Sequence, residues 1–460
     1  MPQLTGKQIH IEPRVPYVPI EPWEWFAENG LEDKGGGMPP MGEGPKLVPS
    51  INIKDGKVAG EILPTVYGGE ITDTTAEDLR IVSYDGLTGG IYAEGPDTDY
   101  TVCGAVISLS GNGQGLGEQS AGAGVSNHAK LTLQDCLIDC SGANRTCTSA
   151  SGGSVLKVYD SALISHGAPY GADSPDPTVY RGAPAPLEIQ GNNRTHCTIQ
   201  NSYSYFYDCL VTADGWAALS TDASNGFVYL EANGCKVVTT KSGYGAYADW
   251  GCHDVFNDCK FDVASQAAII AGEATVRFTD CEINCGTYLT LMHCVMGRHT
   301  EVGELTLIDC DVKTAKNAVE VRGQNVVVIM ENCTVDAGGA LMHTMKNPDP
   351  NAAIVNGRPT PGDELQLIDM SVNGDILHED PERDMRVYMT SAVLTGAIQN
   401  AALIMDQGSR WYATADSTVV IAGDVNTEQI DAPAGVTISA TAEAGQGTYT
   451  LLSGGTLVVA

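Results

Sequence analysis

The chain has 460 residues, of which 53 are glycine and 18% are charged, and its formal net charge is -32 at pH 7. So much glycine disfavours a helix-rich fold, and the negative charge argues against nucleic acid and anionic membrane surfaces as partners, because both bind clustered Lys and Arg. No stretch of 18 apolar residues is present, so we expect no membrane insertion.

The first residues, MPQLTGKQIHIEPR, lack the apolar core of a secretion signal. The 14 cysteines include no CxxC pair, which is typical of reduced thiols in a cytosol. The sequence therefore favours a cytoplasmic protein. An extracellular location is the alternative if the chain is a trimmed form of a longer one.

Residues 1–95 predict an arm followed by irregular capping coils. The arm, up to about residue 50, is rich in Pro and Gly and carries Trp23, Trp25 and Phe26. Aromatic side chains need burial, so we expect the arm to lie over the rest of the fold, as a cap or partly disordered segment rather than as a substrate lid. From Ile51 to Glu94, short strand-like runs alternate with Gly turns.

Residues 96–400 contain a repeated phrase of the form apolar, any, apolar, any, Asp or Asn, then Cys or Ser. Its copies end at Cys136, Ser161, Ser202, Cys281, Cys310 and Cys333, with a variant at Met370 and looser copies at Cys209, Cys235 and Cys259. Most successive copies are about 22 to 29 residues apart. A near-constant period of this length indicates a solenoid.

Apolar and polar residues alternate within each copy, which is the period of a strand with one buried face. One such strand buries too little surface to be stable alone, so successive coils must stack in parallel, about 4.8 Å apart. Stacking predicts a ladder of corner residues that satisfy turns, namely Asp135, Asp160, Asp208, Asp258, Asp280, Asp309, Asn332 and Asp369. Beside it, we expect a ladder of buried cysteines with a structural role.

This pattern resembles the right-handed parallel β-helix of the pectate-lyase-like superfold over roughly residues 98 to 400. The resemblance implies an all-β chain forming a single right-handed parallel β-helix solenoid, with an irregular N-terminal segment and loop insertions. Residues 401–460 predict shorter C-terminal coils. There, Ser409, Trp411, Thr414 and Ser417 resemble the S-x-W-x-x-T-x-x-S repeat of autotransporter-type passengers.

Two long insertions interrupt the coils, at His166–Pro186 and at Lys346–Glu364. Long loops on a rigid scaffold often carry binding residues, and two loops on one side could wall a groove. We expect a further strand of each coil to begin 7 to 14 residues past the Asp-Cys corner, and after the first insertion we expect it to begin at Leu187. The resemblance implies that catalytic groups lie on the outer face formed by these strands.

Two carboxylates on that face, Asp222 and Asp249, end equivalent strands of neighbouring coils, WAALSTD and YGAYAD. Such a pair could work as base or nucleophile and as proton donor. His196 and His293 are further candidate catalytic residues, because histidine transfers protons near neutral pH. Turn capping by the two Asp residues and ordinary packing of the two His residues are the structural alternatives.

Candidate substrate-binding residues combine aromatic rings and polar groups from the same region. They are Arg194, Tyr205, Tyr207, Trp216, Ser220, Tyr244, Tyr247, Arg322 and His343. Aromatic ladders that pack loops against the coils are the alternative interpretation. No metal site is expected, since zinc-ligand spacing, EF-hand loops and GGxGxD repeats are missing from the sequence, and no cofactor is expected either.

Three functions remain open. The first is a cofactor-independent acid–base enzyme, a hydrolase, isomerase or lyase, acting on a carbohydrate or polyhydroxylated substrate. The second is a cytosolic enzyme acting on a phenolic or cyclic metabolite in a pocket closed by loops. The third is a non-catalytic surface or adhesive β-helix. The expected partner is a carbohydrate or small molecule, and the formation of a homo-oligomer is left open.

Overall fold

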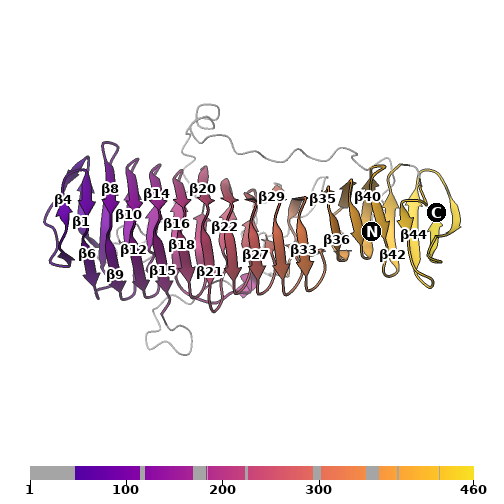
Figure 1. Ribbon diagram of the computed structural model, residues 1–460, viewed down its shortest axis with the longest axis horizontal. Helices are drawn as coiled ribbons and strands as arrows, with labels where there is room; N and C mark the ends of the chain where they lie inside the picture. Colours follow the sequence, from indigo (N-terminus) through magenta and orange to yellow (C-terminus); the bar gives the residue numbers. More distant parts are fainter. Residues whose placement is uncertain are drawn as a thin grey trace. The chain divides into compact units, whose positions relative to one another are not determined.

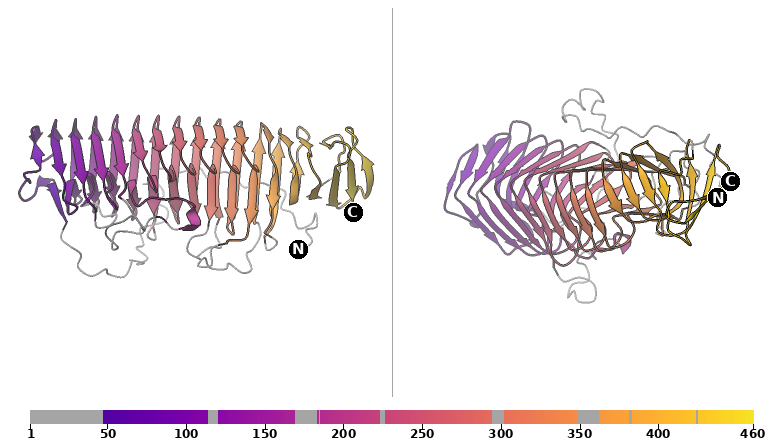
Figure 2. Two further views of the ribbon diagram at one scale, coloured as in Figure 1. Left: turned by 90° about the horizontal axis from the view of Figure 1, so that it is seen from below. Right: turned by 45° about the vertical axis from the view of Figure 1, so that its right-hand side comes forward.

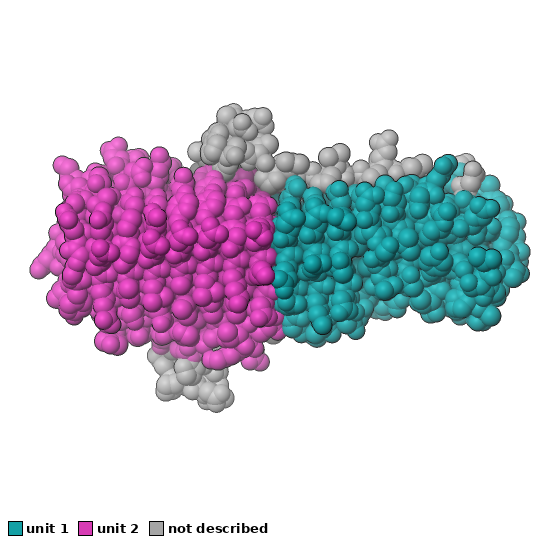
Figure 3. All heavy atoms as spheres, viewed as in Figure 1, with its two compact units in different colours: residues 1–18, 270–460 teal, residues 19–269 magenta. Residues whose placement is uncertain are grey.

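The computed structural model describes residues 47–113, 120–168, 183, 185–222, 226–293, 302–348, 362–380, 383–423 and 425–460. Within these ranges, every regular element is a β-strand except the 3-10 helix η4 (Ala185–Leu187). The residues form two compact units, unit 2 ending at Ile269 and unit 1 containing Ile270–Ala460 (Figure 3). The aromatic arm and most of both insertions lie outside the described residues. The predicted domain bounds, 1–95, 96–400 and 401–460, stay predictions.

Unit 2 repeats a coil of three short strands, and each strand pairs in parallel with its equivalent in the next coil (Figures 1 and 2). The first ladder contains β7 (Thr88–Glu94), β10 (Ala123–Ser126), β13 (Thr148–Ala150), β16 (Arg194–Ile199), β19 (Ala217–Asp222) and β22 (Ala246–Asp249). The second contains β8 (Asp99–Cys103), β11 (Lys130–Gln134), β14 (Val155–Tyr159), β17 (Tyr203–Tyr207), β20 (Val228–Asn233) and β23 (Cys252–Asn257). The third contains β6 (Arg80–Ser83), β9 (Val106–Ser110), β12 (Leu137–Ser141), β15 (Ala162–His166), β18 (Leu210–Ala213), β21 (Lys236–Thr239) and β24 (Lys260–Val263).

The first described coils of unit 2 are less regular than the later ones. Strands β1 (Val48–Lys54) and β5 (Thr75–Glu77) extend the first and second ladders in parallel. Antiparallel pairs are added by β2 (Lys57–Val58), β3 (Val66–Tyr67) and β4 (Glu70–Ile71). Strand β25 (Ala268–Ala271) contains the boundary between the two units.

Unit 1 has the same three-strand coil, with parallel pairing in each ladder. Its first ladder contains β28 (Thr290–His293), β31 (Val319–Arg322), β34 (Met342–Met345), β37 (Ile376–His378) and β40 (Ile398–Met405). Its second contains β26 (Thr275–Thr279), β29 (Val302–Ile308), β32 (Asn325–Glu331), β35 (Asp363–Ile368) and β38 (Met385–Thr390). This second ladder continues through β40 to β42 (Ser417–Ile421), β44 (Thr437–Ala442) and β46 (Thr456–Val459). Strand β45 (Gly447–Thr450) pairs antiparallel with β46.

The third side of unit 1 is made of two separate sheets. One contains β27 (Glu282–Cys285), β30 (Asp311–Thr314) and β33 (Thr334–Ala337), and the other contains β36 (Ser371–Asn373), β39 (Val393–Thr395), β41 (Arg410–Tyr412) and β43 (Ile430–Asp431). Trp411, from the passenger-like repeat, is fully buried and donates its indole N–H to the Gly396 carbonyl. The two units confirm the prediction of an all-β chain whose strands stack in parallel as in a β-helix.

The corner between the second and third strands is a single residue in the left-handed conformation. All eight members of the predicted Asp/Asn ladder have φ between 48° and 54°, and Gly104 and Gly234 occupy the same position in two other coils. Asp, Asn and Gly are the residues that tolerate this conformation best. The corner N–H donates to the carbonyl before the corner of the next coil, as from Asp135 to Tyr159. The backbone conformation therefore explains the ladder, and its side chains are exposed.

The residue after this corner is buried, and where it is Cys or Ser its side chain donates back across the corner. In all seven cysteines of the ladder, the thiol lies 3.2 to 3.4 Å from the carbonyl oxygen two residues earlier. Ser161 makes the same contact at 2.6 Å. All 13 described cysteines are free thiols, and burial raises the pKa of Cys136. These contacts give the position a structural role.

Two local predictions are wrong. The match of CTIQNS to the repeat predicts that it ends a second-ladder strand, as the other copies do. It lies at the end of a first-ladder strand instead, because β16 runs from Arg194 to Ile199. The predicted strand from Leu187 is a 3-10 turn followed by loop, since Glu188 and Gly191 both have positive φ. The repeat phrase could not separate these corners, because Asn201 also adopts the left-handed conformation before a serine.

The corner conformation predicts unequal effects of substitution at Asp135. Asp135→Gly is expected to change the free energy of unfolding by less than about 1 kcal/mol, because Gly104 occupies the equivalent corner. Asp135→Val is expected to lose about 1–2 kcal/mol, because a β-branched residue resists positive φ. Urea unfolding followed by circular dichroism measures both. Equal midpoints for the Gly and Val variants would contradict this account of the corner.

Candidate functional site

The outer face of the first ladder in unit 2 carries the two predicted carboxylates. Strand alternation buries Ala217, Leu219 and Thr221 within the coil and turns Asp222 outward at the end of β19. Strand β22 pairs with β19 in the register Thr221↔Ala248. The next position in this register places Asp222 beside Asp249, on strands that lie about 4.8 Å apart.

Arg194 neutralises one of these carboxylates. Its guanidinium forms an ion pair with Asp222, with side chains that are 12% and 24% exposed, and its Cζ lies 4.9 Å from the ring centroid of Trp216. Burial is the largest single influence on the pKa of Arg194 and lowers it, but the charge and hydrogen bond of Asp222, together with the other neighbouring groups, raise that pKa above its ordinary value. The thiol of Cys197 lies 3.7 Å from the guanidinium and 3.8 Å from the Asp222 carboxylate.

Two tyrosines pack beside the carboxylates. The rings of Tyr244 and Tyr247 are stacked with centroids 5.5 Å apart. The Tyr244 hydroxyl lies 2.8 Å from that of Ser220, and the Tyr247 hydroxyl donates to Asp249 at 3.3 Å. Burial raises the pKa of both tyrosines, and the charge of Asp249 raises that of Tyr247 further. Both hydroxyls therefore stay protonated at neutral pH, as hydrogen-bond donors.

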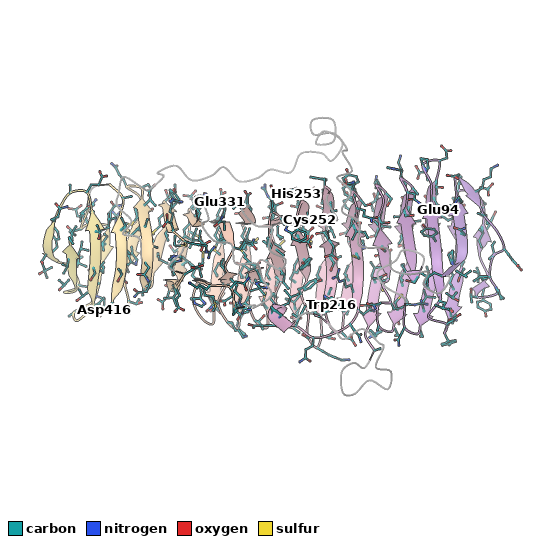
Figure 4. The ribbon with its side chains drawn as sticks, turned by 180° about the vertical axis from the view of Figure 1, so that it is seen from behind. Glu94, Trp216, Cys252, His253, Glu331 and Asp416 are labelled. Atoms are coloured by element: carbon teal, nitrogen blue, oxygen red, sulfur yellow. The ribbon has the colours of Figure 1, made fainter. Side chains whose placement is uncertain are left out.

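We call this set the Asp222–Asp249 cluster. Its members are Arg194, Cys197, Trp216, Ser220, Asp222, Tyr244, Tyr247, Asp249 and Cys252. Figure 4 labels two of them, Trp216 just before β19 and Cys252 at the start of β23. Trp216, Ser220, Tyr244 and Tyr247 are each at most 8% exposed. The two carboxylates at the strand ends are its more accessible part.

His196 does not lie on this face, which corrects the expectation that it accompanies the two carboxylates. Its ring lies within the coil, hydrogen-bonded to Thr148 and Thr198 and packed edge-on against Phe206 at 4.8 Å. Burial lowers the pKa of His196 to about 3. The imidazole is therefore neutral at pH 7 and belongs to the core of the coil.

Tyr205 and Tyr207 lie on the outer face of the second ladder. They alternate with Ser204 and Phe206, both fully buried in the coil. Tyr207 stacks on Tyr159, with centroids 4.9 Å apart and an interplanar angle of 9°, and Tyr205 packs against Tyr229. The structure thus separates these two rings from Trp216, Tyr244 and Tyr247, which belong to the first ladder.

The remaining candidates, His293, Arg322 and His343, belong to the first ladder of unit 1. His293 on β28 lies beside Arg322 on β31, its register partner. His343 on β34 lies beside Glu320 of the same strand β31. They form a set distinct from the Asp222–Asp249 cluster.

The sequence interpretation missed Cys197, Cys252 and Asp254. Strand alternation could have identified Cys197 as outward once the bounds of β16 were known, because its register partner is Ser220. Asp254 is an acidic residue inside the coil. It is fully buried, its Oδ1 accepts a hydrogen bond from Thr221 at 2.9 Å, and its Oδ2 has no hydrogen-bond partner among the described residues.

Within the described ranges, no group of three or more His, Cys, Asp or Glu side chains is arranged to hold a metal ion. Nor does that part of the chain contain a helix of the length and apolarity needed to cross a membrane. Comparison of the chain with protein-family models, with curated proteins and with solved structures gave no match.

Asp254 predicts a specific dependence of stability on pH. Burial raises its pKa well above the ordinary value, and the charges of Asp222 and Asp249 raise it further, against the Thr221 hydrogen bond. The native state then holds a proton that the unfolded state releases, so this residue lowers stability as pH rises above about 4. Asp254→Asn is expected to be more stable than the parent at pH 7, with a difference that vanishes near pH 3.

Urea unfolding at pH 3, 5 and 7 checks this expectation. Asp262→Asn is the matched control, because Asp262 lies exposed on β24 of the same coil. Parallel pH profiles for the parent and Asp254→Asn would show that the buried carboxyl is ionised in the native state.

Proposed function

We propose that the chain is a cofactor-independent acid–base enzyme that hydrolyses a carbohydrate or other polyhydroxylated substrate at the Asp222–Asp249 cluster. The observation that carries this proposal is the register of β19 and β22, which aligns two carboxylates at neighbouring strand ends. Beside them, Arg194 forms an ion pair with Asp222 and the Tyr247 hydroxyl donates to Asp249, so the environments of the two carboxylates differ. Unequal paired carboxylates are what acid–base hydrolysis needs.

The environments assign the roles. Asp222, held in the ion pair with Arg194, acts as nucleophile or base. Two adjacent carboxyl groups resist double ionisation, so Asp249 is the member of the pair that holds and donates the proton. The strand spacing of about 4.8 Å favours the short carboxyl separation, roughly 5 to 5.5 Å, of retaining glycosidases.

A second candidate function is supported by the burial of the tyrosines. Rings as buried as Tyr244 and Tyr247 cannot stack on the face of a sugar without moving, but their protonated hydroxyls can polarise a carbonyl. That arrangement favours a small phenolic or cyclic metabolite, with Asp249 moving the proton. The reaction products distinguish the two functions. A released sugar supports the first function, and a converted phenolic or cyclic metabolite supports the second.

The carboxylate pair predicts the effect of two substitutions on turnover. A panel of aryl glycosides and oligosaccharides is screened with the parent, and the best substrate is assayed with Asp222→Asn and Asp249→Asn. Each variant is expected to lose about 10²–10⁴-fold in kcat, because each removes a group that reacts or transfers a proton. For a glycoside, the anomer released, followed by NMR, is expected to show retention.

Asp208→Asn is the matched control, since Asp208 lies at an exposed corner of the same unit and Asn tolerates the left-handed conformation there. It is expected to keep the parent's kcat. Unchanged turnover in Asp222→Asn and Asp249→Asn, with native circular dichroism, would refute the mechanism. An inactive parent across the panel would refute the proposed substrate class.

A further inference from the structure

A second group of titratable side chains lies on the outer face of the first ladder of unit 1. We call it the His343 cluster, made of Tyr288, Lys316, Asn317, Glu320, Arg322, His343 and Glu379. Strand alternation puts Val319 and Val321 in the core and turns Glu320 and Arg322 outward. The register of β31 and β34 then places His343 beside Glu320.

A buried carboxylate orients the imidazole of His343. The Nδ1 atom of His343 lies 3.0 Å from Oε2 of Glu320, whose side chain is only 5% exposed. The same oxygen accepts a hydrogen bond from Asn317 at 2.9 Å, and Arg322 donates to the other oxygen at 3.4 Å. Glu320 is therefore held from three sides, and the ring of His343 has one defined orientation with Nε2 on the opposite edge.

The position beyond Nε2 is occupied by a carboxylate of the chain itself. Oε2 of Glu379 lies 3.5 Å from Nε2, and its side chain is 67% exposed. This separation exceeds an ordinary N–H···O hydrogen bond, and an ion pair with an exposed carboxylate is weak because water screens it. A loosely held carboxylate at the end of an oriented imidazole marks a place that another carboxylate can take.

Further cations support the same ligand class. Lys316 lies 5.0 Å from the ring centroid of Tyr288, and the guanidinium of Arg322 lies 6.0 Å from it. The cluster therefore contains three cationic side chains, Lys316, Arg322 and His343, beside two carboxylates, Glu320 and Glu379, in a chain whose net charge is -32. We propose that the His343 cluster binds the carboxylate of a small anionic ligand at Nε2 of His343, in competition with the side chain of Glu379.

The test uses the full chain, sodium acetate as the probe and NMR of the histidine Cε1–H resonances at pH 6 and constant ionic strength. Hydrogen bonding to Glu320 raises the pKa of His343 despite burial, so the ring is charged under these conditions. Acetate is expected to shift the His343 resonance saturably, whereas acetamide, the neutral analogue, is not. Glu379→Gln is expected to bind acetate more tightly, by up to about fivefold, because the competing carboxylate is removed.

His166 is an internal control, because it faces Asp139 at 3.7 Å with both side chains about half exposed and without an orienting buried carboxylate. His343→Gln, monitored at the Tyr288 ring, is expected to lose the effect of acetate. Equal shifts at His166 and His343, or no tightening in Glu379→Gln, would overturn the proposal. Asp222→Asn and Asp249→Asn should leave acetate binding unchanged, so this inference and the proposed function can fail separately.

Discussion

Parallel register between equivalent strands is the constraint on which both units depend. Each coil hydrogen-bonds to the next at equivalent positions, so a residue type acceptable at one corner must be acceptable directly above and below it. The left-handed corner is the clearest example. It restricts the position to Asp, Asn or Gly in most coils, and the buried donor that follows contacts the carbonyl across the turn. Sequence periodicity is thus a consequence of backbone geometry.

The same register brings charged side chains together, and the structure handles them differently in three places. At the exposed corners, water screens neighbouring carboxylates. At the ends of β19 and β22, the side chains are partly buried, and Arg194 offsets the charge of Asp222. In the His343 cluster, Glu320 is almost fully buried and is matched by Arg322, Asn317 and His343. Partly buried carboxylates with unequal partners are the places where charge is available for chemistry.

The interior of the coils is not uniformly apolar. His196 is satisfied by Thr148 and Thr198, and in unit 1 the buried Arg383 pairs with Asp363 and Asp380. Asp254 is the exception in its coil, with one oxygen bonded to Thr221 and the other without a partner in the described part of the chain. Its position directly behind the strand that carries Asp222 couples the stability of this coil to the charge on the outer face.

The sequence by itself determined the all-β fold, the parallel stacking of coils, the corner ladder and the buried cysteine ladder, because each depends on a pattern that recurs at one position of every coil. It also paired Asp222 with Asp249, since both end equivalent strands. Only the tertiary structure decided which side chains share a face. His196 lies in register with the buried Leu219 and so turns inward, and the tyrosines of β17 occupy a different ladder from Tyr244 and Tyr247. A shift of one residue in a strand reverses the side to which every side chain points, and local sequence does not fix that register.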